Sequence, residues 1–297
     1  MSLSSILKGK DEESKKLQDI IRTLVPKKVL FKTVSKKKAF SDEYNVLVPY
    51  KLSKSYYSSI VGIAFDYIAK IIVAREIEDK SVYENINAEN GLQRMKRFCN
   101  KETYEELSKR YSQKLGIVIN ESNIRELCGA ACFFAKLEQV NNSGMPPKDI
   151  KGSLLGDMEE EIVDEVTSLV NVFIEKFIKS GIFKGKVIIK PSFGLHSKFV
   201  DGACADICID GVLYNYECSK NTGYKWSDVA ELIGYYLLHL IGIRIGDQSS
   251  DTYNIEIRRV AMYKARVGEI EYVDINDLGD ENILSTLKKL MDFWYIK

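Results

Sequence analysis

Hydrophobic and polar positions along the chain follow two different periods. In most segments the apolar residues recur every three or four positions, which predicts amphipathic helices. These segments cover residues 3–24, 57–77, 83–99, 101–114, 121–139, 157–179, 227–241 and 283–293. In shorter segments apolar and polar residues alternate, which predicts strands. These cover residues 29–34, 186–190, 205–209, 213–219, 254–265 and 269–273. The pattern therefore predicts an α/β protein with a mixed sheet flanked by helices.

Tight turns divide the predicted strands into two hairpins. Asp210 and Gly211 separate two alternating runs, and this pair is typical of a hairpin because glycine accepts a positive φ without steric cost. A second hairpin is predicted around Val267 and Gly268, at the far edge of the sheet. The predicted organisation is an N-terminal helix and arm, a first core helix, a helical insertion and an α/β core, at residues 1–56, 57–79, 80–182 and 183–297.

Polar side chains in the first hairpin point to a shared site. Asp206 stands within an apolar strand, and a carboxylate buried there needs a partner because an unpaired buried charge is costly. Asn215 and Glu217 share one face of the following strand, because strand side chains repeat every two residues. We therefore expect Asp206, Asn215 and Glu217 to converge. On the helix that follows, Glu231 and Tyr235 lie one turn apart, on a different side from the apolar stripe.

This arrangement resembles the PD-(D/E)XK nuclease superfamily in its RecB-like branch. That pattern places an Asp on one strand, a (D/E)-x-K on the next, and a Gln-x-x-x-Tyr on the following helix. The resemblance implies a restriction-endonuclease-like mixed sheet in which Asp206 and a second acid hold Mg²⁺ or Mn²⁺. Oxygen ligands suit such a hard ion, and the ion assists the attack of water on a phosphodiester.

Two positions depart from the family pattern. Asn215-Tyr216-Glu217 stands where the family has Asp-x-Lys, and Glu231 stands at the Gln position. The resemblance implies that Asn215 and Glu217 join the metal site and that Glu217, Glu231 and Tyr235 belong to the catalytic group. Lys220 lies just beyond the strand and is a candidate to replace the missing lysine. It reaches the site only if the strand ends or bulges, because a regular strand points it away from Glu217.

The first core helix carries a further candidate ligand. RecB-like nucleases have a Gly-x-x-x-(His/Glu) on this helix, and Gly62-x-x-x-Asp66 matches it in kind. The resemblance implies that Asp66 is a metal ligand. The alternative is a carboxylate on the polar side of a surface helix.

The resemblance also covers most of the chain in order. The chain is similar to a family of uncharacterised bacterial proteins whose nuclease core ranges from degenerate to intact. The stretches that carry this similarity are MSLSSILKG, SSIVGIAFDYIAKIIVARE, AKLEQV, DGACADICIDGVLYNYE, ELIGYYLL and RRVAMYKARVGEIEYVDINDL.

Charge is nearly balanced over the 297 residues, with a formal net charge of +1, so the whole chain lacks the charge excess typical of nucleic-acid binding. Residues 1–56, however, hold 13 Lys and Arg against 6 Asp and Glu. Such a basic arm is suited to a phosphate backbone. The alternative is an ordinary solvated surface.

Cysteine usage and hydropathy indicate a cellular compartment. The six cysteines form no CxxC pair, which favours free thiols in a reducing cytoplasm over an iron–sulfur cluster. The longest apolar run, residues 235–243, is interrupted by His239 and Gly242, so we expect no membrane span.

Three functions remain open on the sequence. The first is a metal-dependent DNA nuclease with a degenerate motif, acting through Asp206 and Glu217 with Asp66 and Lys220. The second is a catalytically inactive nuclease fold that binds nucleic acid or a protein partner. The third is a protein-interaction scaffold without a role on nucleic acid.

Overall fold

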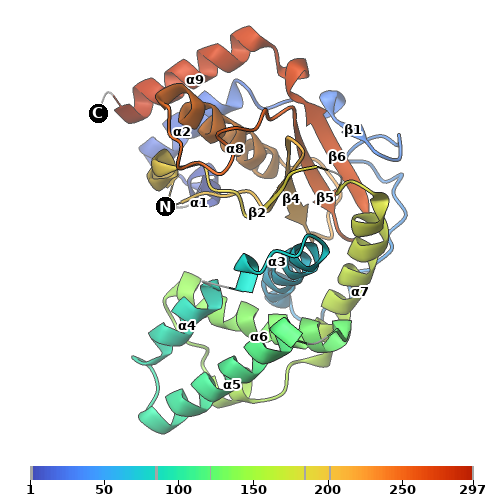
Figure 1. Ribbon diagram of the computed structural model, residues 1–297, viewed down its shortest axis with the longest axis vertical. Coiled ribbons are helices and arrows are strands. Elements are labelled where there is room, and N and C mark those ends of the chain that lie inside the picture. Colours follow the sequence, from blue (N-terminus) through green and yellow to red (C-terminus); the bar gives the residue numbers. More distant parts are fainter. Residues whose placement is uncertain (1–2, 84–85, 121, 184, 201, 296–297) are drawn as a thin grey trace.

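The computed structural model describes residues 3–83, 86–120, 122–183, 185–200 and 202–295. Within them a six-stranded mixed sheet has the strand order β1-β6-β5-β4-β3-β2 (Figure 1). The strands are β1 (Lys32–Thr33), β2 (Val187–Ile189), β3 (Ile207–Ile209), β4 (Val212–Glu217), β5 (Arg259–Lys264) and β6 (Glu269–Asp274). The α/β class and the mixed sheet expected from the sequence are confirmed.

The first predicted hairpin is present and its turn has the expected geometry. Asp210 and Gly211 have φ of 52° and 78° between the antiparallel strands β3 and β4. A Cβ on Gly211 would lie 2.4 Å from the backbone oxygen of Glu256, so the turn also requires a residue without a side chain.

The second predicted hairpin, β5–β6, is also present, but it does not lie at the edge of the sheet. β5 pairs in parallel with β4, and β1 adds a further antiparallel strand outside β6. The N-terminal segment thus supplies the edge strand next to β6, and β2 forms the other edge. The strand predicted from residue 254 begins only at Arg259.

The N-terminal segment is anchored to the sheet through a buried carboxylate. Glu271, fully buried on β6, accepts hydrogen bonds of 2.6 Å from the backbone N–H of Phe40 and the hydroxyl of Tyr44. Lys264 lies 3.7 Å from the same carboxylate and 5.2 Å above the ring of Phe40. Part of the segment predicted as a basic arm therefore packs as a layer of the core.

One face of the sheet is covered by helices from both ends of the chain. Leu213 and Val260 on this face pack in one hydrophobic cluster with the helices α1 (Leu3–Lys8), α2 (Glu12–Arg22), α8 (Trp226–Ile245) and α9 (Asp280–Tyr295). The single helix predicted for residues 3–24 is broken, because Asp11 caps α2 by accepting a 2.8 Å hydrogen bond from Ser14 N.

The opposite face is covered by α3 (Tyr57–Glu76) and the helices that follow it. Figure 1 shows α3 lying between the sheet and a helical lobe. This lobe contains α4 (Asn87–Met95), α5 (Lys101–Asn120) and α6 (Ile124–Ser143), while α7 (Glu160–Lys176) leads back to the sheet. Short helical turns lie at Lys28–Leu30, Ser81–Tyr83, Lys151–Leu155, Ile178–Ser180, Leu195–Val200 and Ile275–Leu278.

The helix α3 contains an apolar stretch that was not identified as a candidate membrane span from the sequence. Its length and composition are sufficient for a membrane span, and 56% of its apolar window is buried inside the protein. Phe65 and Ile68 are fully buried against the helical lobe and the sheet. The core helix of a compact protein meets the same criteria as a membrane span, because both are apolar on most sides.

Candidate functional site

A lysine on α3 holds two carboxylates that come from distant parts of the chain. Asp66 and Lys70 lie one turn apart on α3, and Asp206 directly precedes β3. Lys70 Nζ lies 2.7 Å from Asp66 Oδ2 and 3.5 Å from Asp206 Oδ1. The Lys70 side chain is only 13% exposed. Burial alone would lower the pKa of Lys70, but the carboxylates of Asp66 and Asp206 raise it above its usual value.

The end of β3 and the backbone of β4 set the position of Asp206. Its backbone N–H donates to Tyr214 O at 3.2 Å, and its Oδ2 accepts a 2.7 Å hydrogen bond from Tyr216 N. Burial raises the pKa of Asp206 to about 7, and the nearby Asp66 carboxylate adds to this rise. Lys70 and the Tyr216 N–H oppose the shift. Asp206 therefore titrates close to neutral pH.

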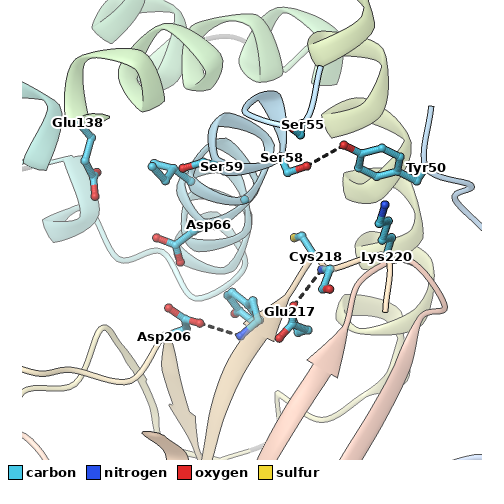
Figure 2. Close-up of a pocket in the computed structure, with 14 residues that line it drawn as sticks. Tyr50, Ser55, Ser58, Ser59, Asp66, Glu138, Asp206, Glu217, Cys218 and Lys220 are labelled. Carbon is cyan, nitrogen blue, oxygen red and sulfur yellow. Dashed lines mark hydrogen bonds between the residues drawn. The ribbon is translucent and has the colours of Figure 1, made fainter. Parts of the chain in front are cut away.

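The two aspartates open onto a pocket of about 680 Å³ between α3 and the ends of β3 and β4. We call it the open pocket. It is lined by Tyr50, Ser55, Ser58, Ser59, Gly62, Ile63, Asp66, Glu138, Asp206, Tyr216, Glu217, Cys218, Ser219 and Lys220. In Figure 2 Asp66 and Asp206 lie on one side of it, while Tyr50 and Lys220 lie on the other. Asp66 Oδ1 is buried and has no hydrogen-bond partner among the described residues.

Glu217 lines the open pocket but is held by other groups than Asp206. Its Oε1 accepts a 2.9 Å hydrogen bond from Ser219 N, and the β4–β5 register places it opposite Lys264. Burial raises the pKa of Glu217, Lys264 opposes this, and a hydrogen bond with the Asp228 carboxyl raises it further. The closest charged neighbours of Glu217 named by these effects are thus Lys264 on β5 and Asp228 on α8, although Glu217 shares the open pocket with Asp206.

Asn215 is not among the described residues that line the open pocket. The Oδ1 atom of Asn215 is buried and has no hydrogen-bond partner among all the residues that the structure describes. The open pocket therefore brings Asp206 and Glu217 together as expected, but Asn215 does not line it. Asn215 lies two residues after Leu213, which packs on the α8 side of the sheet, whereas Asp66 approaches Asp206 from α3.

Lys220 lines the open pocket on the side away from Asp66 and Asp206 (Figure 2). Its Nζ lies 5.0 Å above the ring of Tyr50. The cation beside the aspartates is Lys70, which the sequence analysis missed. An available signal was the spacing Asp66-x-x-x-Lys70, since residues four apart on a helix form ion pairs. Such pairs are common on helix surfaces, so the spacing alone does not mark a site.

Glu231 and Tyr235 lie on the other face of the sheet and do not line the open pocket. The Tyr235 hydroxyl donates a 2.9 Å hydrogen bond to Glu231 Oε1. The Tyr235 ring is 7% exposed and stacks on Phe193 with centroids 5.6 Å apart. The pair does not line the open pocket as expected, because α8 buries Tyr235 between the sheet and the N-terminal helices. Burial raises the pKa of Tyr235, and the carboxylates of Glu231 and Asp206 add to this rise, so Tyr235 remains within electrostatic reach of Asp206.

A glutamate of the helical lobe also joins the site and was not predicted. Glu138 on α6 lines the open pocket and accepts a hydrogen bond from the Tyr67 hydroxyl. Tyr67 in turn accepts a 3.0 Å hydrogen bond from Ala88 N. This chain of bonds ties α3, α4 and α6 together beside Asp66.

The donor set of the site is compatible with one hard divalent cation. Within the described part of the chain, no group of three or more His, Cys, Asp or Glu side chains is arranged to hold a metal ion by itself. Mg²⁺ is commonly held by one or two carboxylates together with water and substrate phosphate. Asp66, whose buried Oδ1 has no hydrogen-bond partner among the described residues, and Asp206, whose Oδ1 lies 3.5 Å from Lys70 Nζ, provide such a pair.

Comparison with family models, with curated proteins and with solved structures gives no match to this chain. The chemistry of the site must therefore be inferred from its own residues.

Proposed function

We propose that the protein is a metal-dependent nuclease of the PD-(D/E)XK type, with DNA as its substrate. The observation that carries the proposal is the pair Asp66 and Asp206, joined by Lys70 at the wall of an open pocket of about 680 Å³. Carboxylates crowded around a buried cation are suited to phosphodiester chemistry, which needs charge neutralisation at the phosphate.

In this proposal Asp66 and Asp206 hold Mg²⁺ or Mn²⁺, which supplies Lewis-acid chemistry and an acidified water. Lys70 keeps the two carboxylates together when they are ionised and offers its ammonium to a phosphate oxygen. It takes the role that the sequence assigned to Lys220. Lys220 and the serines at the start of α3 line the opposite side of the open pocket, where they are placed to contact the neighbouring phosphates.

The test uses the purified full chain with labelled single- and double-stranded DNA, in Mg²⁺, in Mn²⁺ and in a chelator. We expect cleavage that requires the metal and falls at least a hundredfold in Asp66→Asn and in Asp206→Asn. A matched control is Asp164→Asn, because Asp164 is an exposed carboxylate that pairs with Arg125 on the surface. This control keeps wild-type activity.

Failure would take a specific form. If the wild-type protein binds DNA but cuts it with neither metal, the nuclease proposal is wrong and the inactive binding fold replaces it. If it neither binds nor cuts, the interaction scaffold replaces both.

A further inference from the structure

A second, smaller pocket adjoins the same carboxylates. We call it the side pocket, and its volume is about 270 Å³. It shares Asp66 and Glu138 with the open pocket, and Lys70 also lines it. Ile71, Asn87, Val118, Phe134, Ile189 and Lys190 also line it. The cluster around Lys70 therefore stands between two cavities, one on each side.

Part of the wall of the side pocket is apolar and buried. Val118 and Phe134 are fully buried, and Ile71 is 3% exposed. The volume lies below the range of about 300–1,000 Å³ that is usual for drug-sized ligands. A cavity of this size is suited to one flat heterocycle and too small for a base pair.

Polar groups occur at the side pocket beside these walls. Asn87 begins α4, and its Oδ1 lies 3.4 Å from Lys190 Nζ. An amide both donates and accepts hydrogen bonds, which matches the mixed edges of a nucleobase. The Tyr67 hydroxyl is already engaged with Glu138 and Ala88 N, so it stiffens the wall.

The loop after β2 connects the side pocket to Asp206. The backbone N–H of Lys190 donates a 2.9 Å hydrogen bond to Asp206 O. Lys190 has a φ of 51°, a conformation that side chains with a Cβ rarely adopt. The strained residue that positions Asp206 therefore also brings a cation to the side pocket.

We propose that the side pocket receives one nucleobase of a single-stranded polynucleotide whose adjacent phosphate lies at Asp66, Lys70 and Asp206. This inference rests on the proposed function of that cluster and names its substrate class. A strand that passes from the open pocket to the side pocket crosses the cluster. A base enters a separate pocket only when it is unstacked and unpaired, so the preferred substrate is single-stranded or has an unpaired end.

The test measures equilibrium binding, so that cleavage does not affect it. The full chain with Asp206→Asn is titrated with a fluorescent single-stranded DNA, with its duplex, and with a series of strands that each carry one abasic residue. The label sits at a fixed end. The wild-type protein is assayed for cleavage of the same strands. We expect the single strand to bind at least tenfold more tightly than the duplex, and one abasic position to weaken binding roughly five- to 150-fold.

Two variants on β2 distinguish the effect of filling the side pocket from the effect of adding a bulky side chain to this strand. Ile189→Trp fills the side pocket, whereas Ile188→Trp adds the same bulk on the opposite face of β2. Ile189→Trp abolishes the effect of the abasic residue, and Ile188→Trp preserves it. Asn87→Leu is a second probe that weakens binding of intact strands more than of the abasic one.

The outcomes distinguish this inference from the proposed function. Equal affinity for intact and abasic strands, or an unchanged abasic effect in both Ile189→Trp and Asn87→Leu, overturns the base pocket even if the protein cuts DNA. Absence of any binding overturns it as well. Base-dependent binding without cleavage by the wild type supports the pocket and overturns only the nuclease.

Discussion

Lys70 Nζ on α3 lies 3.5 Å from Asp206 Oδ1 at the start of β3. This contact joins the helix that carries the helical lobe to the sheet, and it places a nearly buried cation at the wall between two pockets. The position of Lys70 is therefore important for both the stability and the chemistry of the site.

Replacing Lys70 by Met should destabilise the protein by about 3 kcal/mol at pH 8. The change leaves Asp66 and Asp206 facing each other without a cation, and removing one partner of a buried ion pair is costly. The loss should be smaller at pH 5.5, where Asp206 takes up a proton. Urea unfolding at both pH values measures it. Lys179→Met breaks an exposed pair with Glu175 at the same helical spacing, and it should cost less than about 0.5 kcal/mol.

Asp206→Asn should remove a pH dependence of stability. The pKa of Asp206 is raised from 3.8 to about 7, so the folded protein binds the proton more tightly than the unfolded chain. The contribution of Asp206 to stability therefore falls as the pH rises from about 4 to 7, and Asn avoids this fall. We expect the stability of the variant relative to the wild type to increase across that range, so that the variant is the more stable protein at pH 8.

Asp274 provides a control, because its contribution to stability changes with pH in the opposite direction to that of Asp206. Burial acts to raise the pKa of Asp274, but hydrogen bonds from Lys32 and Arg259 lower it below its usual value. Its contribution is present above the unfolded pKa of 3.8 and is lost as the pH falls through the folded value. Asp274→Asn should therefore be less stable than the wild type at pH 8. Urea midpoints that run parallel for both variants would contradict the assignment of Asp206.

Tyr235→Phe should leave DNA cleavage within about threefold of the wild type. The hydroxyl of Tyr235 bonds to Glu231 on the face of the sheet away from the open pocket, so its loss removes one buried hydrogen bond and costs about 1 kcal/mol. Steady-state kinetics and thermal unfolding measure the two effects. A large loss of turnover with unchanged stability would restore Tyr235 to the catalytic group.

Two glycine substitutions should change stability in opposite directions. Gly211→Ala forces a side chain onto a φ of 78° and places its Cβ 2.4 Å from Glu256 O, so we expect a loss of about 2 kcal/mol or more. Gly62 lies inside α3 with open space around an added Cβ, so Gly62→Ala should gain about 0.5–1 kcal/mol. Denaturant unfolding of both variants tests this contrast.

Local patterns identified the elements that depend on local forces. The Asp210–Gly211 turn follows from the sterics of positive φ, and the period of residues 57–77 predicted α3 almost to its ends. The similarity of Gly62-x-x-x-Asp66 to a family motif indicated that Asp66 belongs near Asp206, and the structure brings both residues to one pocket.

The sequence by itself determined the α/β class, both hairpins and Asp66 and Asp206 as candidates, because steric limits and hydrophobic period act between near neighbours. The tertiary structure alone decided which side chains meet. Asn215 and Glu217 alternate correctly, but α8 and β5 draw Glu217 toward Asp228 and Lys264. The spacing of Asp66 and Lys70 is typical of a surface ion pair, and only the packing of α3 on the sheet brings Asp206 to Lys70. Tyr235 is buried because α8 packs against α1 and α9. Long-range packing sets these contacts, and the spacing of residues along the chain does not encode it.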